Sequence, residues 1–184
     1  MIWNNHSNLE GQHAFLGASK YHWINYDEEK IAVAYMKFIA TQKGTELHAL
    51  AAELIKNKVK LPKSKKTFNM YVNDAIGYGM KPEQVLYYSN NAFGTADSII
   101  FKNELLRIHD LKTGTTNTSE HQLEIYAALF CLEYNKKPNE IDMELRIYQN
   151  DDVRIYLPDP DTIFHIMDKI IIFDKRIEKL KTEE

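Results

Sequence analysis

The stretch FGTADSIIFKNELLRIHDLK, residues 93–112, decides the fold because it combines two strand-like runs with a short turn. The first run lies within Tyr87–Phe101 and the second is Leu105–Leu111, and aliphatic and aromatic residues predominate in both. Asn103-Glu104 separates the runs, and two-residue loops are the commonest connections of β-hairpins. We therefore expect an antiparallel hairpin in which positions equidistant from this turn face each other.

Two acidic residues occupy facing positions of this hairpin. Asp97 and Asp110 are equidistant from the turn, so both carboxylates stand on one face. Directly opposed side chains have Cβ atoms about 4.5–5.5 Å apart, and like charges at that spacing are destabilising. A divalent cation such as Mg²⁺ compensates the pair because it binds carboxylate and phosphate oxygens together. The pair therefore predicts a metal site.

Lys112 adds a cation suited to phosphodiester cleavage. It follows Asp110 by two residues, so strand alternation places its ammonium on the same face, where it can hold an attacking water or offset charge on a phosphate. An Asp-x-Lys sequence is also common by chance, as solvated charges at a strand end. Asp110 and Lys112, however, are expected on the same face of the strand as the apolar Leu106 and Ile108. A core-facing Asp and Lys without a function would be costly.

Patterns outside the hairpin complete a mixed α/β fold. From Tyr26 to about Lys58 the sequence favours helix, and we expect Gly44 to break this region in two. The second part carries an apolar stripe of Leu47, Leu50, Ala51, Leu54 and Ile55. The other expected elements are a helix at 67–77, a polar connection through Pro82, a polar segment at 113–119, a helix at 120–134, a second hairpin over 143–157 and a final helix from about Asp161. This order predicts one domain, residues 1–184, with a central mixed β-sheet flanked by helices.

Composition limits the classes of function. The chain has 184 residues, 44% of them hydrophobic, which suffices for one domain with its own core. The single cysteine, Cys131, excludes an intramolecular disulfide, a four-cysteine zinc site and a cysteine-ligated iron–sulfur cluster, and it favours a cytoplasmic location. No apolar run approaches the roughly 18 residues of a membrane span, and residues 1–10 lack a signal-peptide pattern. We therefore expect neither secretion nor membrane insertion.

The charge distribution bears on nucleic-acid binding. A net charge of −3 argues against binding by bulk charge alone. The strongest basic cluster is Lys56–Lys66, in which Pro62 ends any preceding helix, so we expect an exposed loop. This loop is either a solvated surface segment or a track for a DNA backbone.

Four motifs, in this order along the chain, resemble those of the PD-(D/E)XK nuclease superfamily, in particular its RecB-type domains and related phage nucleases. They are Gly44-Thr-Glu-Leu-His48, Gly94-Thr-Ala-Asp97, Asp110-Leu-Lys-Thr-Gly114 and Gln122-Leu-Glu-Ile-Tyr126. Ala96 stands where the superfamily name places proline. The segment His13–Ser19, followed by Trp23-Ile-Asn25, is also similar to the opening of phage members. The resemblance covers about residues 13–135.

The resemblance implies a restriction-endonuclease-like core and a DNA nuclease that depends on Mg²⁺ or Mn²⁺. The metal-binding positions that it implies are His48, Asp97, Asp110 and Leu111. The catalytic positions are Asp97, Asp110, Lys112, Gln122 and Tyr126. Some relatives bind an iron–sulfur cluster through four cysteines, which the cysteine count excludes here.

The resemblance also implies a biological setting. It suggests exonuclease action on DNA ends in phage or prophage recombination or DNA processing, in the cytoplasm of a bacterial host. A recombination or single-strand annealing protein is then a candidate partner. The residues themselves do not separate an exonuclease from an endonuclease, and they do not give cleavage polarity or oligomeric state.

Several of these residues also have a structural interpretation. His48 is consistent with a partly buried helix histidine, and Glu46, about 200° away around the helix axis, is a reserve ligand that cannot face the same metal. Gln122 follows Ser119 at capping-box spacing, so its amide is able to reach the helix N-terminus instead. Tyr126 belongs to the apolar helix face, where packing alone explains it.

Two other functions compete with the nuclease. One is a DNA-binding or partner-binding accessory protein that keeps the nuclease fold without cutting. The other is an α/β metal-binding enzyme that acts on a different phosphate ester. Metal binding without cleavage of any DNA would favour the first, and preference for a small phosphodiester would favour the second.

Overall fold

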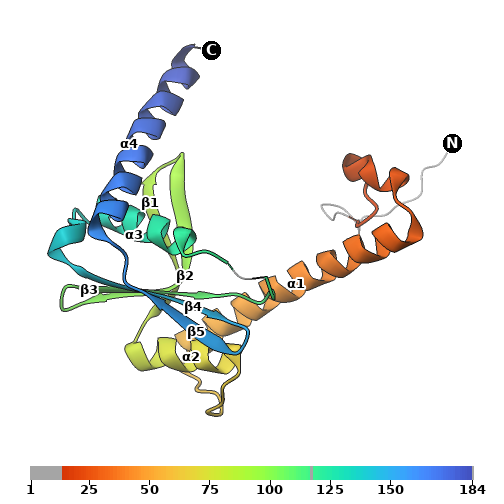
Figure 1. Ribbon diagram of the computed structural model, residues 1–184, viewed down its shortest axis with the longest axis horizontal. Coiled ribbons are helices and arrows are strands. Elements are labelled where there is room, and N and C mark those ends of the chain that lie inside the picture. Colours follow the sequence, from red (N-terminus) through yellow and green to blue (C-terminus); the bar gives the residue numbers. More distant parts are fainter. Residues whose placement is uncertain (1–13, 117, 184) are drawn as a thin grey trace, which may run out of the picture. The chain divides into compact units, whose positions relative to one another are not determined.

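The computed structural model describes residues 14–116 and 118–183 (Figure 1). Residues 1–10 and His13, on which two of the expectations rest, lie outside these ranges, as does Asn117 in the polar segment. Contacts between Cα atoms divide the chain into two units, Met1–Thr45 and Glu46–Glu184. The single-domain prediction stays a prediction, and the fold below is that of the second unit.

A five-stranded mixed sheet, in the order β1-β2-β3-β4-β5, forms the centre of this unit (Figure 1). Its strands are β1 (Lys81–Ser89), β2 (Ala92–Lys102), β3 (Leu105–Leu111), β4 (Asp142–Gln149) and β5 (Asp152–Tyr156). Only β3 and β4 pair in parallel, and the other neighbours are antiparallel. The predicted mixed sheet flanked by helices is therefore confirmed.

The β2–β3 hairpin has the predicted register. Ser98 pairs with His109, and the ladder continues without a shift to the turn. Asn103 and Glu104 have φ values of 52° and 53°, the left-handed conformation that both central residues of a type I′ turn require. Asp97 and Asp110 therefore follow directly on the last paired rung of the ladder.

Strand β1 corrects the expectation of a polar connection through Pro82. The strand pairs antiparallel with β2, with Pro82 opposite Ser98 and Leu86 opposite Gly94. Because β1 is the edge of the sheet, the missing N–H of a proline disrupts no ladder on its outer side. The hairpin predicted from the sequence is thus the second half of a three-stranded antiparallel segment.

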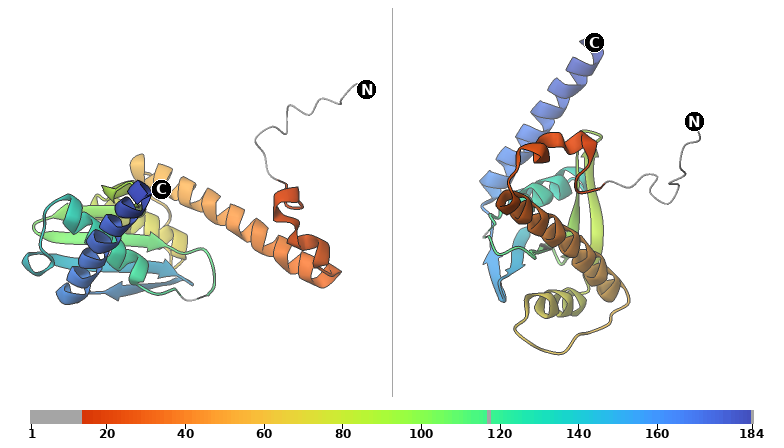
Figure 2. Two further views of the ribbon diagram at one scale, coloured as in Figure 1. Left: turned by 90° about the horizontal axis from the view of Figure 1, so that it is seen from above. Right: turned by 90° about the vertical axis from the view of Figure 1, so that its right-hand side faces the viewer.

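Helices cover both faces of the sheet (Figure 2). Those of the second unit are the last part of α1 (Glu28–Lys56), α2 (Thr67–Tyr78), α3 (His121–Glu133) and α4 (Pro160–Glu183), with a short 3₁₀ helix at Pro138–Glu140. The first unit contains the start of α1 and a 3₁₀ helix at Ala18–Asn25. Helix α2 packs on β3 and β4. Helix α3 packs on β1 to β4 and also contacts α4. Among the described residues, no helix combines the length and apolarity needed to cross a membrane.

Helix α1 departs from the expectation in two ways. It runs through Gly44 without a break, because a glycine within a helix costs only about 1 kcal/mol relative to alanine. Its apolar stripe is also narrower than expected. Ala51 and Ile55 are buried, whereas Leu47 and Leu50 are 37% and 47% exposed.

The two faces of the sheet carry separate cores. On the α3 side, Leu106 and Ile108 pack with Leu145 and Cys131. On the α2 side, Leu111 packs with residues of α1, α2 and β4. Strand β3 is therefore buried on both faces, as a central strand in a sheet with helices on both sides must be.

The two tight turns give a matched prediction about stability. Glu104 and Asp151 both follow an asparagine and both have positive φ, at 53° and 58°. Replacing Glu104 by glycine relieves this backbone strain and removes only an exposed ion pair with Lys136, so we expect a gain of about 0.5 kcal/mol in the free energy of unfolding. Urea denaturation measures the change.

Asp151→Gly is expected to act in the opposite direction. The Asp151 carboxylate accepts hydrogen bonds from the Lys66 Nζ at 2.8 Å and from the Thr67 amide at 2.9 Å, at the start of α2. The replacement should therefore lower the free energy of unfolding despite relieving the same strain. Stabilisation by both replacements would contradict the proposed capping of α2.

Candidate active site

The ends of β2 and β3 bring the two predicted carboxylates together. The Oδ2 of Asp97 accepts a hydrogen bond from the backbone amide of Leu111 at 2.8 Å, which links the two strands beyond their regular ladder. Asp110 is only 2% exposed, whereas the Asp97 side chain is 15% exposed. The Asp110 carboxylate is therefore buried, whereas the Asp97 carboxylate is partly accessible to solvent.

The buried Asp110 carboxylate is electrostatically unfavourable as it stands. Burial raises the pKa of Asp110, the neighbouring Asp97 raises it further, and Lys112 and His48 oppose the rise. Its Oδ2 lies 3.0 Å from the Lys112 Nζ, but among the described residues this oxygen accepts no hydrogen bond of acceptable geometry. The oxygen thus has one ion-pair partner and an unfilled hydrogen-bonding capacity.

Helix α3 holds Lys112 in place. The Lys112 Nζ donates to the Oε1 of Gln122 at 2.7 Å, and the Nε2 of Gln122 donates to the Tyr126 hydroxyl at 3.0 Å. Gln122 and Tyr126 are one helical turn apart, which makes this chain of bonds possible. Among the described residues no side chain caps the N-terminus of α3, and Gln122 bonds to Lys112 and Tyr126 instead, so the capping-box interpretation of Gln122 and Ser119 is wrong.

Glycine at position 94 makes room for Tyr126. A Cβ atom added to Gly94 would lie 2.8 Å from the Tyr126 Cε1, which is closer than two non-bonded carbon atoms approach each other. The half-buried Tyr126 packs against the core on the α3 side as well. Its packing and polar roles therefore coexist, and Gly94 of the second motif supports the fourth motif.

His48 and a residue absent from the sequence prediction complete the site. The Nδ1 of His48 lies 3.3 Å from the Oδ1 of Asp97, and this contact raises the pKa of His48. The Glu83 carboxylate joins them, because one ligand atom from each of the three residues lies within 4.8 Å of the other two. Burial, followed by the charge of Asp97, raises the pKa of Glu83.

Glu83 was missed because β1 was not recognised as a strand. The β1–β2 register places Gln84 opposite Ala96 and Pro82 opposite Ser98, so Glu83 falls at the level of Asp97. Its φ of 49° interrupts the regular strand there. The available signal was Asn90-Asn91, a turn-forming pair that would have suggested a hairpin and hence this pairing.

Two other predicted positions take different places. Glu46, the reserve ligand, is exposed and lies outside the cluster, as its angle on the helix predicted. Leu111 buries its side chain in the core on the α2 side and offers the site its backbone. Its predicted metal contact stays a prediction.

The contacts of the basic loop, Lys56–Lys66, favour its interpretation as a solvated surface segment. Its residues pack on α2, where Leu61 exchanges two hydrogen bonds with the side chain of Asn73. Helix α2 covers the face of the sheet opposite α3, whereas Lys112 is held by α3. Lys56, at the end of α1, is the exception because it borders a pocket that Glu83 also lines.

The donor set fits a hard divalent cation. Two carboxylates and one imidazole converge, the buried Asp110 interacts electrostatically with two of these groups, and carboxylate oxygens are the ligands that Mg²⁺ and Mn²⁺ favour. The unsatisfied Oδ2 of Asp110 and the raised pKa values of Asp110 and Glu83 are the costs that a bound cation would remove. Asp97, Asp110, Glu83 and His48 could therefore hold a metal ion.

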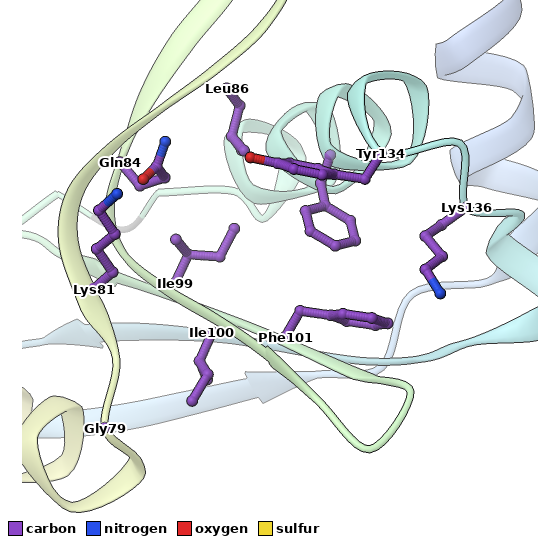
Figure 3. A pocket seen from close by; sticks show the side chains of 10 residues that line it. Gly79, Lys81, Gln84, Leu86, Ile99, Ile100, Phe101, Tyr134 and Lys136 are labelled. Carbon is purple, nitrogen blue, oxygen red and sulfur yellow. The ribbon is translucent and has the colours of Figure 1, made fainter.

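A more apolar pocket of about 520 Å³ lies elsewhere, between α3 and the β1–β2 strands (Figure 3). Lys81 and Lys136 stand on opposite sides of it, and Ile99 and Phe101 lie between them. The described residues that line this pocket include no predicted site residue and no carboxylate. The candidate active site is the cluster at the strand ends.

Comparisons with known proteins add a partial match. A family model described as "Protein of unknown function (DUF2800)" matches residues 81–156, fewer than half of the chain. The matched segment runs from the start of β1 to the end of β5, so it includes Glu83, Asp97, Asp110 and Lys112 but not His48. Comparison with curated proteins and with solved structures gives no match.

The contact between Gly94 and Tyr126 gives a prediction about the support of the site. Gly94→Ala should lower the free energy of unfolding by about 1–3 kcal/mol, because its methyl group overlaps the tyrosine ring. The same replacement in a Tyr126→Ala background should cost markedly less. Thermal denaturation of the four proteins measures this coupling.

Gly77→Ala is the matched control. Gly77 lies in α2, and a Cβ atom there would meet nothing within 4 Å, so alanine should stabilise the helix by up to about 1 kcal/mol. Equal destabilisation by Gly94→Ala in both backgrounds would show that Tyr126 is not what the added methyl group meets.

Proposed function

We propose that the protein is a metal-dependent DNA nuclease of the PD-(D/E)XK type. The observation that carries the proposal is the buried Asp110, whose Oδ2 lies 3.0 Å from the Lys112 ammonium and whose pKa is raised by burial and by the neighbouring Asp97 carboxylate. Such an arrangement is costly unless a bound cation and a phosphate complete it. The four-motif resemblance adds independent support for the same chemistry.

Asp97, Asp110, Glu83 and His48 are the proposed metal ligands. A Mg²⁺ or Mn²⁺ ion held by these residues would supply positive charge to offset the negative charge that develops on the phosphate oxygens during cleavage. The Glu83 carboxylate extends the ligand set that the sequence predicted. No iron–sulfur cluster belongs to the proposal, because the chain has a single cysteine.

Lys112, Gln122 and Tyr126 have a positioning role in this proposal. An ammonium group donates only, so Lys112 binds either the attacking water or a non-bridging phosphate oxygen. Gln122 is in turn oriented by Tyr126, which limits the positions that the lysine can take. During hydrolysis the water oxygen bonds to phosphorus and gives up a proton, the phosphorus–oxygen bond to the leaving group breaks, and the leaving oxygen acquires a proton.

The biological setting of the proposal rests on the resemblance alone. We infer an exonuclease that acts on DNA ends in phage or prophage recombination, in the bacterial cytoplasm. A recombination or single-strand annealing protein is the candidate partner. The alternative is an accessory protein with the same fold that binds DNA or a partner without cutting.

Cleavage assays test the activity. We expect degradation of linear DNA with Mg²⁺ or Mn²⁺, none with EDTA, and survival of closed circles if the enzyme needs ends. Asp110→Ala and Glu83→Gln should each lower the rate, Asp110→Ala by about a thousandfold. The matched control is Glu46→Gln, which removes an exposed carboxylate from α1 and should leave the rate unchanged.

Two outcomes would count against the nuclease. Intact DNA in every condition, with Mn²⁺ still bound in calorimetry, would support the accessory protein. Equal losses in Glu83→Gln and Glu46→Gln would remove Glu83 from the metal site.

A second prediction concerns the positioning of Lys112. Gln122→Leu keeps the side-chain size but removes the acceptor of the Lys112 hydrogen bond, so the cleavage rate should fall about tenfold or more with little change in the melting temperature. Gln122→Glu keeps that acceptor and should retain more activity. A large drop in melting temperature without a rate effect in Gln122→Leu would indicate a purely structural glutamine.

A further inference from the structure

Two aromatic side chains are exposed as a pair on the β1–β2 hairpin. Tyr87 and Phe93 are cross-strand partners with ring centroids 6.4 Å apart and an interplanar angle of 28°. They are 45% and 61% exposed, and Val85 beside them is 47% exposed. Leu86 and Gly94 on the same strands face α3, so the aromatic pair lies on the other face of the hairpin.

The pair lies in line with the candidate active site along the same two strands. Glu83 and Asp97 lie four residues along the two strands from Tyr87 and Phe93, and the strands pair regularly between them from Leu86–Gly94 to Gln84–Ala96. At about 3.4 Å per residue the separation is roughly 14 Å along the hairpin. That length matches about four stacked nucleotides at 3.4 Å each.

On the other side of Glu83 lies a pocket of about 690 Å³ with two lysines. It is formed by the end of α1 and the start of β1, and Lys56, Asn57 and Lys81 offer donors for phosphate oxygens there. Glu53 and Glu83 also line it, so its cations lie beside the proposed metal ligands. The proposed cleavage site thus has an aromatic surface on one side and a pocket with two lysines on the other.

We propose that these features form a track for single-stranded DNA along β1. The inference rests on the proposed function, and it adds the form of the substrate. Bases stack on Tyr87 and Phe93, the scissile phosphate lies at Glu83 and Asp97, and Lys56 and Lys81 bind the phosphates beyond it. Base stacking on aromatic rings is a general mode of single-strand binding and requires no sequence preference.

The exposed rings favour a single strand over a duplex. In a duplex the flat faces of the bases are already stacked on one another, and the surface is phosphate, sugar and base edges. Only unpaired bases can present their faces to Tyr87 and Phe93. A net charge of −3 is also easier to reconcile with a short local track than with a broad duplex interface.

Fluorescence anisotropy tests the track without cleavage. The probe is a labelled oligothymidine of about 20 nucleotides, longer than the usual footprint of single-strand binding folds, in EDTA. The Tyr87→Ala/Phe93→Ala protein should bind it about 10- to 100-fold more weakly. The matched control is Tyr134→Ala/Phe173→Ala, which removes rings of 48% and 59% exposure from α3 and α4 and should leave binding unchanged.

The two lysines of the pocket are tested by the salt dependence of binding. Lys56→Gln/Lys81→Gln should reduce the slope of log affinity against log salt by about 1.4, the value for two phosphates of a single strand. Lys60→Gln/Lys63→Gln, in the loop packed on α2, is the control and should leave the slope unchanged.

The outcomes separate the track from the nuclease. Loss of binding in the aromatic variant but not in its control supports the track even if no DNA is ever cut. Wild-type protein that cleaves DNA but binds the single strand no better than the aromatic variant would overturn the track and leave the nuclease intact. Tighter binding of a blunt duplex of the same length, unaffected by the aromatic variant, would overturn it as well.

Discussion

The burial of the Asp110 carboxylate at the end of β3 is the constraint on which the rest of the site depends. A carboxylate at 2% exposure needs compensating charge, and Lys112 provides it at 3.0 Å. Lys112 is oriented by Gln122, and Gln122 by Tyr126. Tyr126 in turn fits only because position 94 has no side chain. One buried charge thus explains why residues from three separate elements are placed as they are.

Much of the fold could be predicted because it depends on local rules. The β2–β3 register follows from a two-residue turn, and the structure has the left-handed φ values of a type I′ turn at both residues. Helices α2 and α3 begin and end within about one residue of the expected bounds, and α4 begins at Pro160, next to the expected Asp161. The errors came where tertiary packing decides. Gly44 lies within a continuous helix, and Pro82 lies on an edge strand where its missing N–H is harmless.

The candidate site was only partly predictable for the same reason. Asp97, Asp110 and Lys112 are linked by short-range strand geometry, so spacing alone brought them together. Glu83 joins them through the β1–β2 pairing and a backbone conformation that no strand pattern indicates. From the sequence, Gln122 was able to bond either to the N-terminus of its own helix or to Lys112. The position of Lys112 beside α3, which the sequence does not indicate, decides for Lys112. The spacing of residues along the sequence gives little indication of which side chains meet through tertiary packing.

The irregular backbone of β1 also bears on how copies of the protein meet each other in solution. An edge strand exposes a row of unpaired N–H and C=O groups that can recruit a strand from a second molecule. In β1, Pro82 lacks an N–H, Glu83 turns the backbone away at a φ of 49°, and the Tyr87 N–H is occupied by the Glu133 carboxylate at 2.9 Å. The same irregularity that brings Glu83 to the candidate site therefore guards the sheet against edge-to-edge aggregation.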